Sequence, residues 1–191
     1  MEVEFFLVSF IPVILFGWYF QIKWKYLLLG LPPFLVALFM ELFFKPYFSA
    51  IVFLIFIVPV IEEVLKFLHT AGNKDKKTGV AIGLMFAGLE NFLYFMSFSS
   101  VFFLIFILRE LSDPILHSTT TSISTRTWKG KILTGIGLSI FLHSFWNFFS
   151  VIIATDYYLI WILASVYFTI EIVYMKDVKL KFRKKVNAIE S

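Results

Sequence analysis

Two adjacent glutamates and a lysine interrupt an apolar part of the chain, in the segment VPVIEEVLKF of residues 58–67. Glu62 and Lys66 are four residues apart, so they share one face of a helix, with the glutamate on the favourable N-terminal side. Glu63 is turned about 100° from Glu62 and is free to point elsewhere. One glutamate can therefore be held ionised by Lys66 while the other keeps a different protonation state, as a general base or acid requires. Pro59, one turn before Glu62, could break the helix and admit water to the carboxylates.

Three further segments pair a titratable or amide side chain with a neighbour at helical spacing. Glu90 is followed by Asn91, and His143 and Asn147 are four residues apart. The Asn147 amide could orient the His143 imidazole or, with it, hold an oxyanion or a metal-bound water. His117 forms the third pair, with a threonine four residues later. These segments add histidine and amide chemistry to that of the two glutamates.

Charged residues are too numerous in the apolar segments to be accidental. Each one costs about 2.5 to 3.5 kcal/mol at the centre of a membrane helix on insertion scales. Arg109 is expected to neutralise Glu110 or Asp113, and Glu41 and Glu171 are interpreted as interfacial. A single buried histidine or asparagine is more often a hydrogen-bonding residue than a catalyst. It is the collection of such residues on several helices that favours a functional site.

The elements that carry these residues are apolar helices. The chain has 191 residues, 60% of them hydrophobic, and no long polar insert. Crossing a bilayer as a helix takes about 20 apolar residues. The pattern predicts an all-α, polytopic membrane helix bundle, with a single integral domain over residues 1–175 and a basic cytoplasmic tail over residues 176–191. The seven predicted transmembrane helices cover residues 5–20, 27–44, 47–68, 78–95, 101–122, 132–150 and 157–175.

Lysine and arginine occur after every second predicted span, which places nearly all of them on one side of the membrane. They follow the first, third, fifth and seventh spans, whereas only Lys45 lies on the opposite side. Under the positive-inside rule, the N-terminus lies outside the cell membrane and the C-terminus lies in the cytoplasm. The net charge of +4 thus marks topology and contact with the lipid bilayer, and we expect no nucleic-acid partner. The N-terminus lacks the features of a cleaved signal peptide, so the first span is expected to be retained.

In this topology the titratable residues of the third to sixth spans lie at similar depths. Glu62 and Glu63 fall in the cytoplasmic third of their helix, and His117 lies in the cytoplasmic half of its own. Glu90 and His143 lie about 17 Å inside their cytoplasmic ends, at about 1.5 Å per residue. We therefore expect a central four-helix polar core around a cavity that opens to the cytoplasm. The first, second and seventh helices would form its wall.

The order and spacing of these residues resemble the PrsW family of intramembrane proteases, part of a superfamily with the CAAX prenyl endopeptidases and bacterial CAAX-like immunity proteins. The resemblance covers about residues 59–147, and its motifs are short individually but specific in combination. The motifs are Glu62-Glu63-x-x-Lys66, Phe86-Ala87-x-x-Glu90-Asn91-x-x-Tyr94, His117-x-x-x-Thr121 and His143-x-x-Trp146-Asn147.

The resemblance implies an intramembrane endopeptidase that hydrolyses a peptide bond of a membrane-bound or membrane-proximal protein. PrsW-like enzymes act in the regulated proteolysis of a membrane-anchored regulator. Glu62 or Glu63 would be the general base that activates water, Lys66 would tune the glutamates, and Asn147 would stabilise the oxyanion. The other implied catalytic residues are Glu90, His117 and His143, and we assign supporting roles to Asn91 and Arg109.

Two catalytic versions are compatible with these residues. In the first, Glu63 and a histidine activate water without a metal. In the second, His117, His143 and a carboxylate, from Glu63 or Glu90, bind one divalent ion such as zinc and leave a position open for water. The chain has no cysteine and no His-Glu-x-x-His segment, and the prenyl endopeptidase branch has a histidine where this chain has Glu90. We favour the version without metal.

Two other functions fit the same residues. A proton-coupled transporter or channel also carries chains of glutamate and histidine through the membrane. Against it, the polar groups cluster toward one side, and no inverted repeat is visible. An inactive relative of the protease, which only binds membrane partners, would keep the same fold. The expected substrate is a membrane-anchored protein, and the sequence leaves the oligomeric state open.

Overall fold

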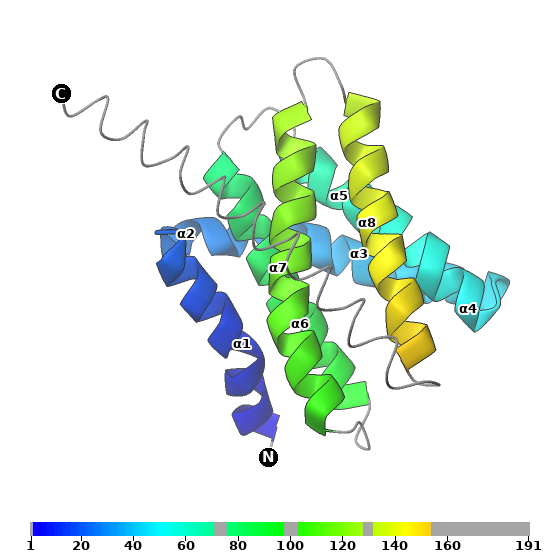
Figure 1. Cartoon of the computed structure of the whole chain (residues 1–191), viewed down its shortest axis with the longest axis horizontal. Helices are drawn as coiled ribbons and strands as arrows, with labels where there is room; N and C mark the ends of the chain where they lie inside the picture. The colour runs from blue at the N-terminus through cyan, green and yellow to red at the C-terminus, as the bar shows by residue number, and fades with distance from the viewer. Residues whose placement is uncertain (1, 71–75, 98–102, 128–131, 154–191) are drawn as a thin grey trace.

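The structure, a computed structural model, describes residues 2–70, 76–97, 103–127 and 132–153 (Figure 1). Every regular element in these ranges is a helix and none is a strand, which confirms the all-α prediction. The elements are α1 (Glu2–Tyr19), α2 (Trp24–Leu27), the 3₁₀ helix η1 (Leu28–Gly30), α3 (Leu31–Phe44), the 3₁₀ helix η2 (Lys45–Tyr47), α4 (Ala50–Val52), the π-helix η3 (Phe53–Ile57), α5 (Val58–Thr70), α6 (Lys76–Ser97), α7 (Phe103–Thr127) and α8 (Ile132–Ile153).

Helices α6, α7 and α8 form the centre of the bundle (Figure 1). α7 packs against α6 and against α8, and α1 packs against α6. α3 and α5 lie behind these helices in this view and contact each other. α5 also contacts α6, α7 and α8, so its side chains can meet side chains from all three central helices.

Three helical segments in the described ranges are long and apolar enough to cross a membrane. They are Trp24–Tyr47, Lys77–Met96 and Ile132–Ser150. Large apolar side chains are exposed on the outer surface, among them Phe39 at 72% and Leu133 at 86%. Such apolar outer faces are typical of a membrane protein. The seventh predicted span, residues 157–175, and the tail, residues 176–191, lie outside the described residues.

The predicted third span consists of α4, the π-helix η3 and α5, which follow one another directly, so its winding changes along its length. η3 leads directly into α5, and the Val58 N–H donates to the Phe53 carbonyl, five residues back rather than the usual four. The break expected near Pro59 is therefore a widened π-turn just before this proline. Proline fits there because it lies in the first turn of α5, where its missing N–H has the least effect on the helix.

Two glycines let α6 and α7 approach closely. A Cβ atom on Gly83 would lie 2.2 Å from the His117 carbonyl oxygen, and one on Gly79 would lie 2.6 Å from Thr125 Oγ1. Any larger residue at these positions would push the helices apart. Small residues one turn apart are a common device for tight packing of membrane helices. This contact fixes the position of His117 relative to α6.

The C-terminal half of α7 turns an almost continuous series of hydroxyl groups toward its neighbours. The serine and threonine side chains of residues 118–125 are all buried. Thr121 Oγ1 donates to the His117 carbonyl at 2.7 Å, and Ser139 of α8 donates to the Thr120 carbonyl at 2.8 Å. The Thr121 hydroxyl thus binds the His117 backbone and not the imidazole ring.

Candidate active site

α5 buries its glutamates and its lysine, while several of its apolar side chains face outward. Glu62, Glu63 and Lys66 are 2%, 0% and 0% exposed, whereas Val60 and Leu68 are 44% and 58% exposed. This pattern is the reverse of a soluble surface helix, and it suits a helix whose outer face meets lipid. The buried charges must therefore be satisfied by partners within the bundle.

The Lys66 ammonium contacts both glutamates, and its closer partner is Glu63. Lys66 Nζ lies 2.6 Å from Glu63 Oε1 and 3.6 Å from Glu62 Oε2. The predicted pair of Glu62 and Lys66 is present. The prediction that Glu63 is free to point elsewhere is wrong, because residues three apart also share a helix face. Lys66 also lies over the Phe86 ring of α6, with Nζ 4.5 Å from the ring centroid.

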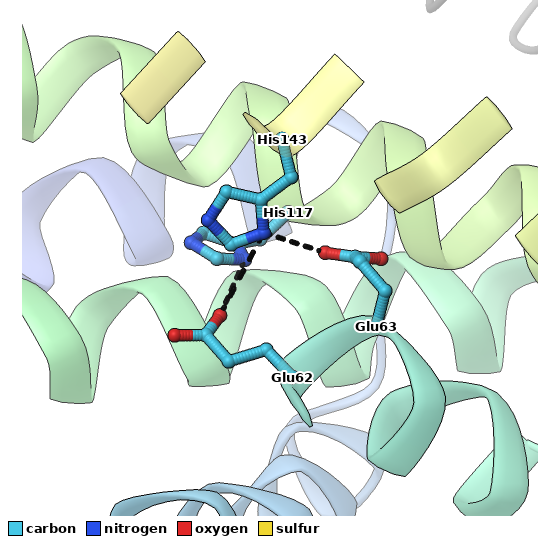
Figure 2. Close-up of side chains that lie close together, drawn as sticks. All are labelled: Glu62, Glu63, His117 and His143. Carbon is cyan, nitrogen blue, oxygen red and sulfur yellow. Dashed lines mark hydrogen bonds and ion pairs between the residues drawn. The ribbon is translucent and has the colours of Figure 1, made fainter. Parts of the chain in front are cut away.

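Glu63 is held by three donors from three helices. Its Oε1 accepts from Lys66 at 2.6 Å, from His143 Nδ1 of α8 at 3.0 Å and from Thr120 Oγ1 of α7 at 3.2 Å. Figure 2 shows the contact between His143 and Glu63. Three donors on one oxygen favour the ionised carboxylate. When His143 donates from Nδ1 and its ring is neutral, its Nε2 can only accept a hydrogen bond.

His117 connects Lys66 to a second group of charges. Its Nδ1 lies 2.6 Å from Lys66 Nζ, and its Nε2 lies 2.8 Å from Glu90 Oε2. An ammonium can only donate, so His117 Nδ1 accepts and the ring hydrogen lies on Nε2, facing Glu90. The His117 and His143 rings meet edge to face, with centroids 4.9 Å apart.

Glu62 is less constrained than Glu63. Its Oε2 lies 3.8 Å from Nδ1 of both His117 and His143 (Figure 2). No donor in the described part of the chain forms a hydrogen bond with this oxygen atom. Glu41 of α3 lies beside Glu62, and two carboxyl groups can form a hydrogen bond only when they share a proton. Glu41 was interpreted as interfacial, and the structure instead places it beside the site.

A second group of charges surrounds Arg109 of α7. Its Nη2 lies 3.0 Å from Asp113 Oδ2, as expected, and also binds Glu90 of α6. Trp146 of α8 donates from Nε1 to Asp113 Oδ1 at 3.0 Å. The Arg109 guanidinium also lies 4.2 Å from the centroid of the Tyr94 ring. Sequence spacing within α7 could indicate Asp113, but not the partners on α6 and α8.

We call the first group the Lys66 cluster and the second the Arg109 cluster. The Lys66 cluster consists of Glu62, Glu63, Lys66, His117 and His143. The Arg109 cluster consists of Glu90, Arg109, Asp113 and Trp146. His117 and Glu90 join the two clusters through their 2.8 Å contact.

Two predicted site residues lie apart from both clusters. Asn147 Nδ2 donates to the Leu54 carbonyl of η3 at 2.8 Å, and this bond gives it a different role from orienting His143. Asn91 is buried on α6 next to Glu110, which accepts a hydrogen bond from Ser9 of α1 at 3.1 Å. Five of the six residues predicted to be catalytic are therefore joined by direct contacts, and Asn147 is not among them.

The structure also brings in residues that the sequence did not single out. Thr120 binds Glu63, Glu41 lies beside Glu62, and Trp146 binds Asp113. Trp146 belongs to the motif His143-x-x-Trp146-Asn147, but the sequence assigned it no role. Glu41 could have been suspected, because a carboxylate in the middle of an apolar segment needs a partner as much as Glu62 does.

Two sets of side chains bring possible metal ligands within 4.8 Å of one another. Each set is already in contact with a cation from the chain itself. Lys66 lies 2.6 Å from Glu63 and from His117, which belong to one set, and Arg109 binds Glu90 and Asp113 of the other. A divalent ion would have to displace these cations from its ligands, so neither set fits a metal as it stands.

Comparison of the chain with protein-family models, with curated proteins and with solved structures finds no match.

Proposed function

We propose that the chain is an intramembrane endopeptidase in which Glu62 activates water. The observation that supports this proposal is the buried Glu62 oxygen, 3.6 Å from the Lys66 ammonium and 3.8 Å from two imidazole nitrogens, which accepts no hydrogen bond from the described residues. Glu63 is the poorer candidate for the base, because three donors already engage its Oε1.

In the proposed reaction, Glu62 takes a proton from a water molecule, and the water oxygen bonds to the carbonyl carbon of the scissile peptide. The carbonyl oxygen becomes an oxyanion, which the Lys66 ammonium and the neighbouring imidazoles stabilise electrostatically. When the carbon–nitrogen bond breaks, the leaving amine takes the proton from Glu62. The products are a new carboxyl terminus and a new amino terminus.

The wider architecture is part of the same proposal. Seven spans, with the N-terminus outside and the C-terminus in the cytoplasm, would leave the Lys66 cluster accessible from the cytoplasmic side. The motif resemblance to the PrsW family supports a membrane-anchored protein as the substrate. Residues 1–175 would form the single protease domain.

Purified protein in detergent, with fluorescently labelled casein as an unfolded test substrate, provides the test. Wild type should release labelled peptides, whereas Glu62→Gln should not, although both should unfold at similar temperatures. Glu110→Gln is a matched control, because it changes a buried carboxyl group that contacts Ser9 and lies outside both clusters. Full activity in Glu62→Gln would refute the proposed base.

A proton-coupled transporter is the second candidate, and one observation favours it. Contacts run without interruption from Glu63 through Lys66, His117 and Glu90 to Arg109 and Asp113. Such a chain of ionisable groups is typical of proton relays in membranes. Liposomes that carry the protein and an internal pH-sensitive dye would distinguish the candidates. Proton flux without peptide release would favour transport, and neither activity would favour an inactive relative.

A further inference from the structure

The π-turn before Pro59 leaves one backbone carbonyl without a partner in its own helix. In an α-helix the Leu54 carbonyl would accept from the N–H of residue 58, but the Val58 N–H donates to Phe53 instead. In a π-helix the donor would be residue 59, which is a proline and has no N–H. Neither possible donor of the helix can therefore satisfy Leu54.

Asn147 of α8 supplies the missing donor. Its Nδ2 lies 2.8 Å from the Leu54 carbonyl oxygen, across the contact between η3 and α8. A carbonyl left unpaired in an apolar environment costs about 1 to 3 kcal/mol. The sequence resemblance implied an oxyanion-stabilising amide at Asn147, but one of the two amide hydrogens on its Nδ2 already binds the backbone of the chain.

We propose that Asn147 is a positioning residue that locks the π-turn of η3 to α8 and so sets the direction in which α5 presents Glu62 and Glu63. The same stretch of α8 carries His143, one turn before Asn147, and His143 contacts Glu63 at 3.0 Å. α5 and α8 are thus tied at two points, one at the π-turn and one at the glutamates. The π-turn matters because relaxing it to α-helical winding would shift the register by about one residue and so rotate α5 by about 100° in total relative to the chain before η3.

Replacing Pro59 tests the lock, because alanine at this position restores the N–H that Leu54 lacks. In the wild-type background, Asn147→Ala should lower the unfolding midpoint by about 2 to 8 °C. In the Pro59→Ala background the same substitution should have less than half of that effect. Equal shifts in the two backgrounds would overturn the proposal. Ser150→Ala, one turn beyond on α8, is the matched control and should give the same shift in both.

The geometry of the two helices can be followed without any activity. The chain has no cysteine, so spin labels on Val60→Cys of α5 and Phe141→Cys of α8 would be the only ones, and both positions are exposed. The distance distribution between the labels should broaden in Asn147→Ala and narrow again when Pro59→Ala is added. An unchanged distribution in Asn147→Ala would show that Asn147 does not position α5.

The activity arm of this inference rests on the proposed endopeptidase function. Far below the unfolding midpoint, Asn147→Ala should lower the turnover of casein by about 100-fold, as expected when reacting groups are misplaced by about 1 Å. Pro59→Ala should restore part of that turnover. An oxyanion donor could not be replaced in this way, so failure of the rescue with intact label distances would favour the oxyanion role. If wild type has no activity, the proposed function fails, while the midpoints and label distances still decide the role of Asn147.

Discussion

The Lys66 and Arg109 clusters have the same charge inventory and different degrees of constraint. Each combines two carboxyl groups with one cation, and His117 lies between them. The Lys66 cluster is at most 2% exposed, whereas Glu90 and Arg109 are 25% and 15% exposed. Lysine carries a compact charge on a flexible stem, and arginine carries a planar fork that holds two acids at once.

Under the proposed function, this difference separates a cluster that carries out chemistry from a cluster that anchors the helices. The Arg109 cluster contains no imidazole of its own, and its guanidinium keeps its charge at any physiological pH. The Lys66 cluster contains two imidazoles and a carboxylate oxygen that receives no hydrogen bond from the described residues. We therefore expect substitutions in the Lys66 cluster to affect both chemistry and stability, and substitutions in the Arg109 cluster to affect mainly stability.

The largest expected effect contrasts one carboxyl group from each cluster. Glu62→Gln should lower the turnover of casein by about 10²- to 10⁴-fold, the usual contribution of a general base. Asp113→Asn, which keeps the shape and an acceptor for Trp146, should lower turnover by less than about tenfold. The measurement is the initial rate at saturating substrate. Equal losses in the two variants would remove the distinction between the clusters.

Removal of each cation should give the next largest effect. Lys66→Met leaves two fully buried carboxyl groups without a counter-charge, which should cost about 3 to 5 kcal/mol in stability. Arg109→Met should cost about 1 to 3 kcal/mol, because water can reach the partly exposed Glu90. Urea unfolding in mixed micelles, followed by tryptophan fluorescence, would compare the two. A greater loss in Arg109→Met would show that the depth of burial does not decide which cation contributes more to stability.

The link between the clusters can be broken at His117. In the wild-type background, the effects of Glu63→Gln and Glu90→Gln on the free energy of unfolding should be non-additive by about 0.5 to 3 kcal/mol. Glu90 contacts His117 directly, and Glu63 is connected to it through Lys66. In a His117→Phe background their effects on unfolding free energy should add. Coupling that survives the loss of the imidazole would show that it travels by another route.

Single neutral donors should give the smallest effects. Thr120→Val removes one of three donors to Glu63, and Trp146→Phe removes the indole donor to Asp113. Each should lower the unfolding midpoint by about 2 to 4 °C. Only Thr120→Val should also change turnover, by a few-fold. The opposite result, in which Trp146→Phe changes turnover and Thr120→Val does not, would place the chemistry in the Arg109 cluster.

Patterns within one helix were predictable from the sequence, and contacts between helices were not. Spacing placed Lys66 near the glutamates and Arg109 near Asp113, because residues three and four apart share a face. It could not show that Glu63 meets His143, 80 residues away, or that Arg109 reaches Glu90. Those contacts depend on how α5, α6 and α8 pack around α7.

Backbone details were also beyond the reach of the sequence. Pro59 marked a disturbance in the helix, but a proline can accompany a kink, a gap or a π-turn equally well. The role of Asn147 depends on that choice, since only the π-turn leaves Leu54 without a donor in its own helix. Glu41 was misjudged because its partner Glu62 lies on another helix.

The wide spacing of the Lys66 cluster along the chain has a consequence during synthesis. Glu63 and His143 are 80 residues apart, and a ribosome makes about 5 to 20 residues per second. For about 4 to 16 seconds after Glu63 is made, its partner on α8 does not yet exist, but Lys66 follows only three residues later. Lys66 can therefore neutralise the Glu63 carboxylate while the newly made α5 enters the bilayer. The Lys66 cluster is completed only after α8 has been synthesised.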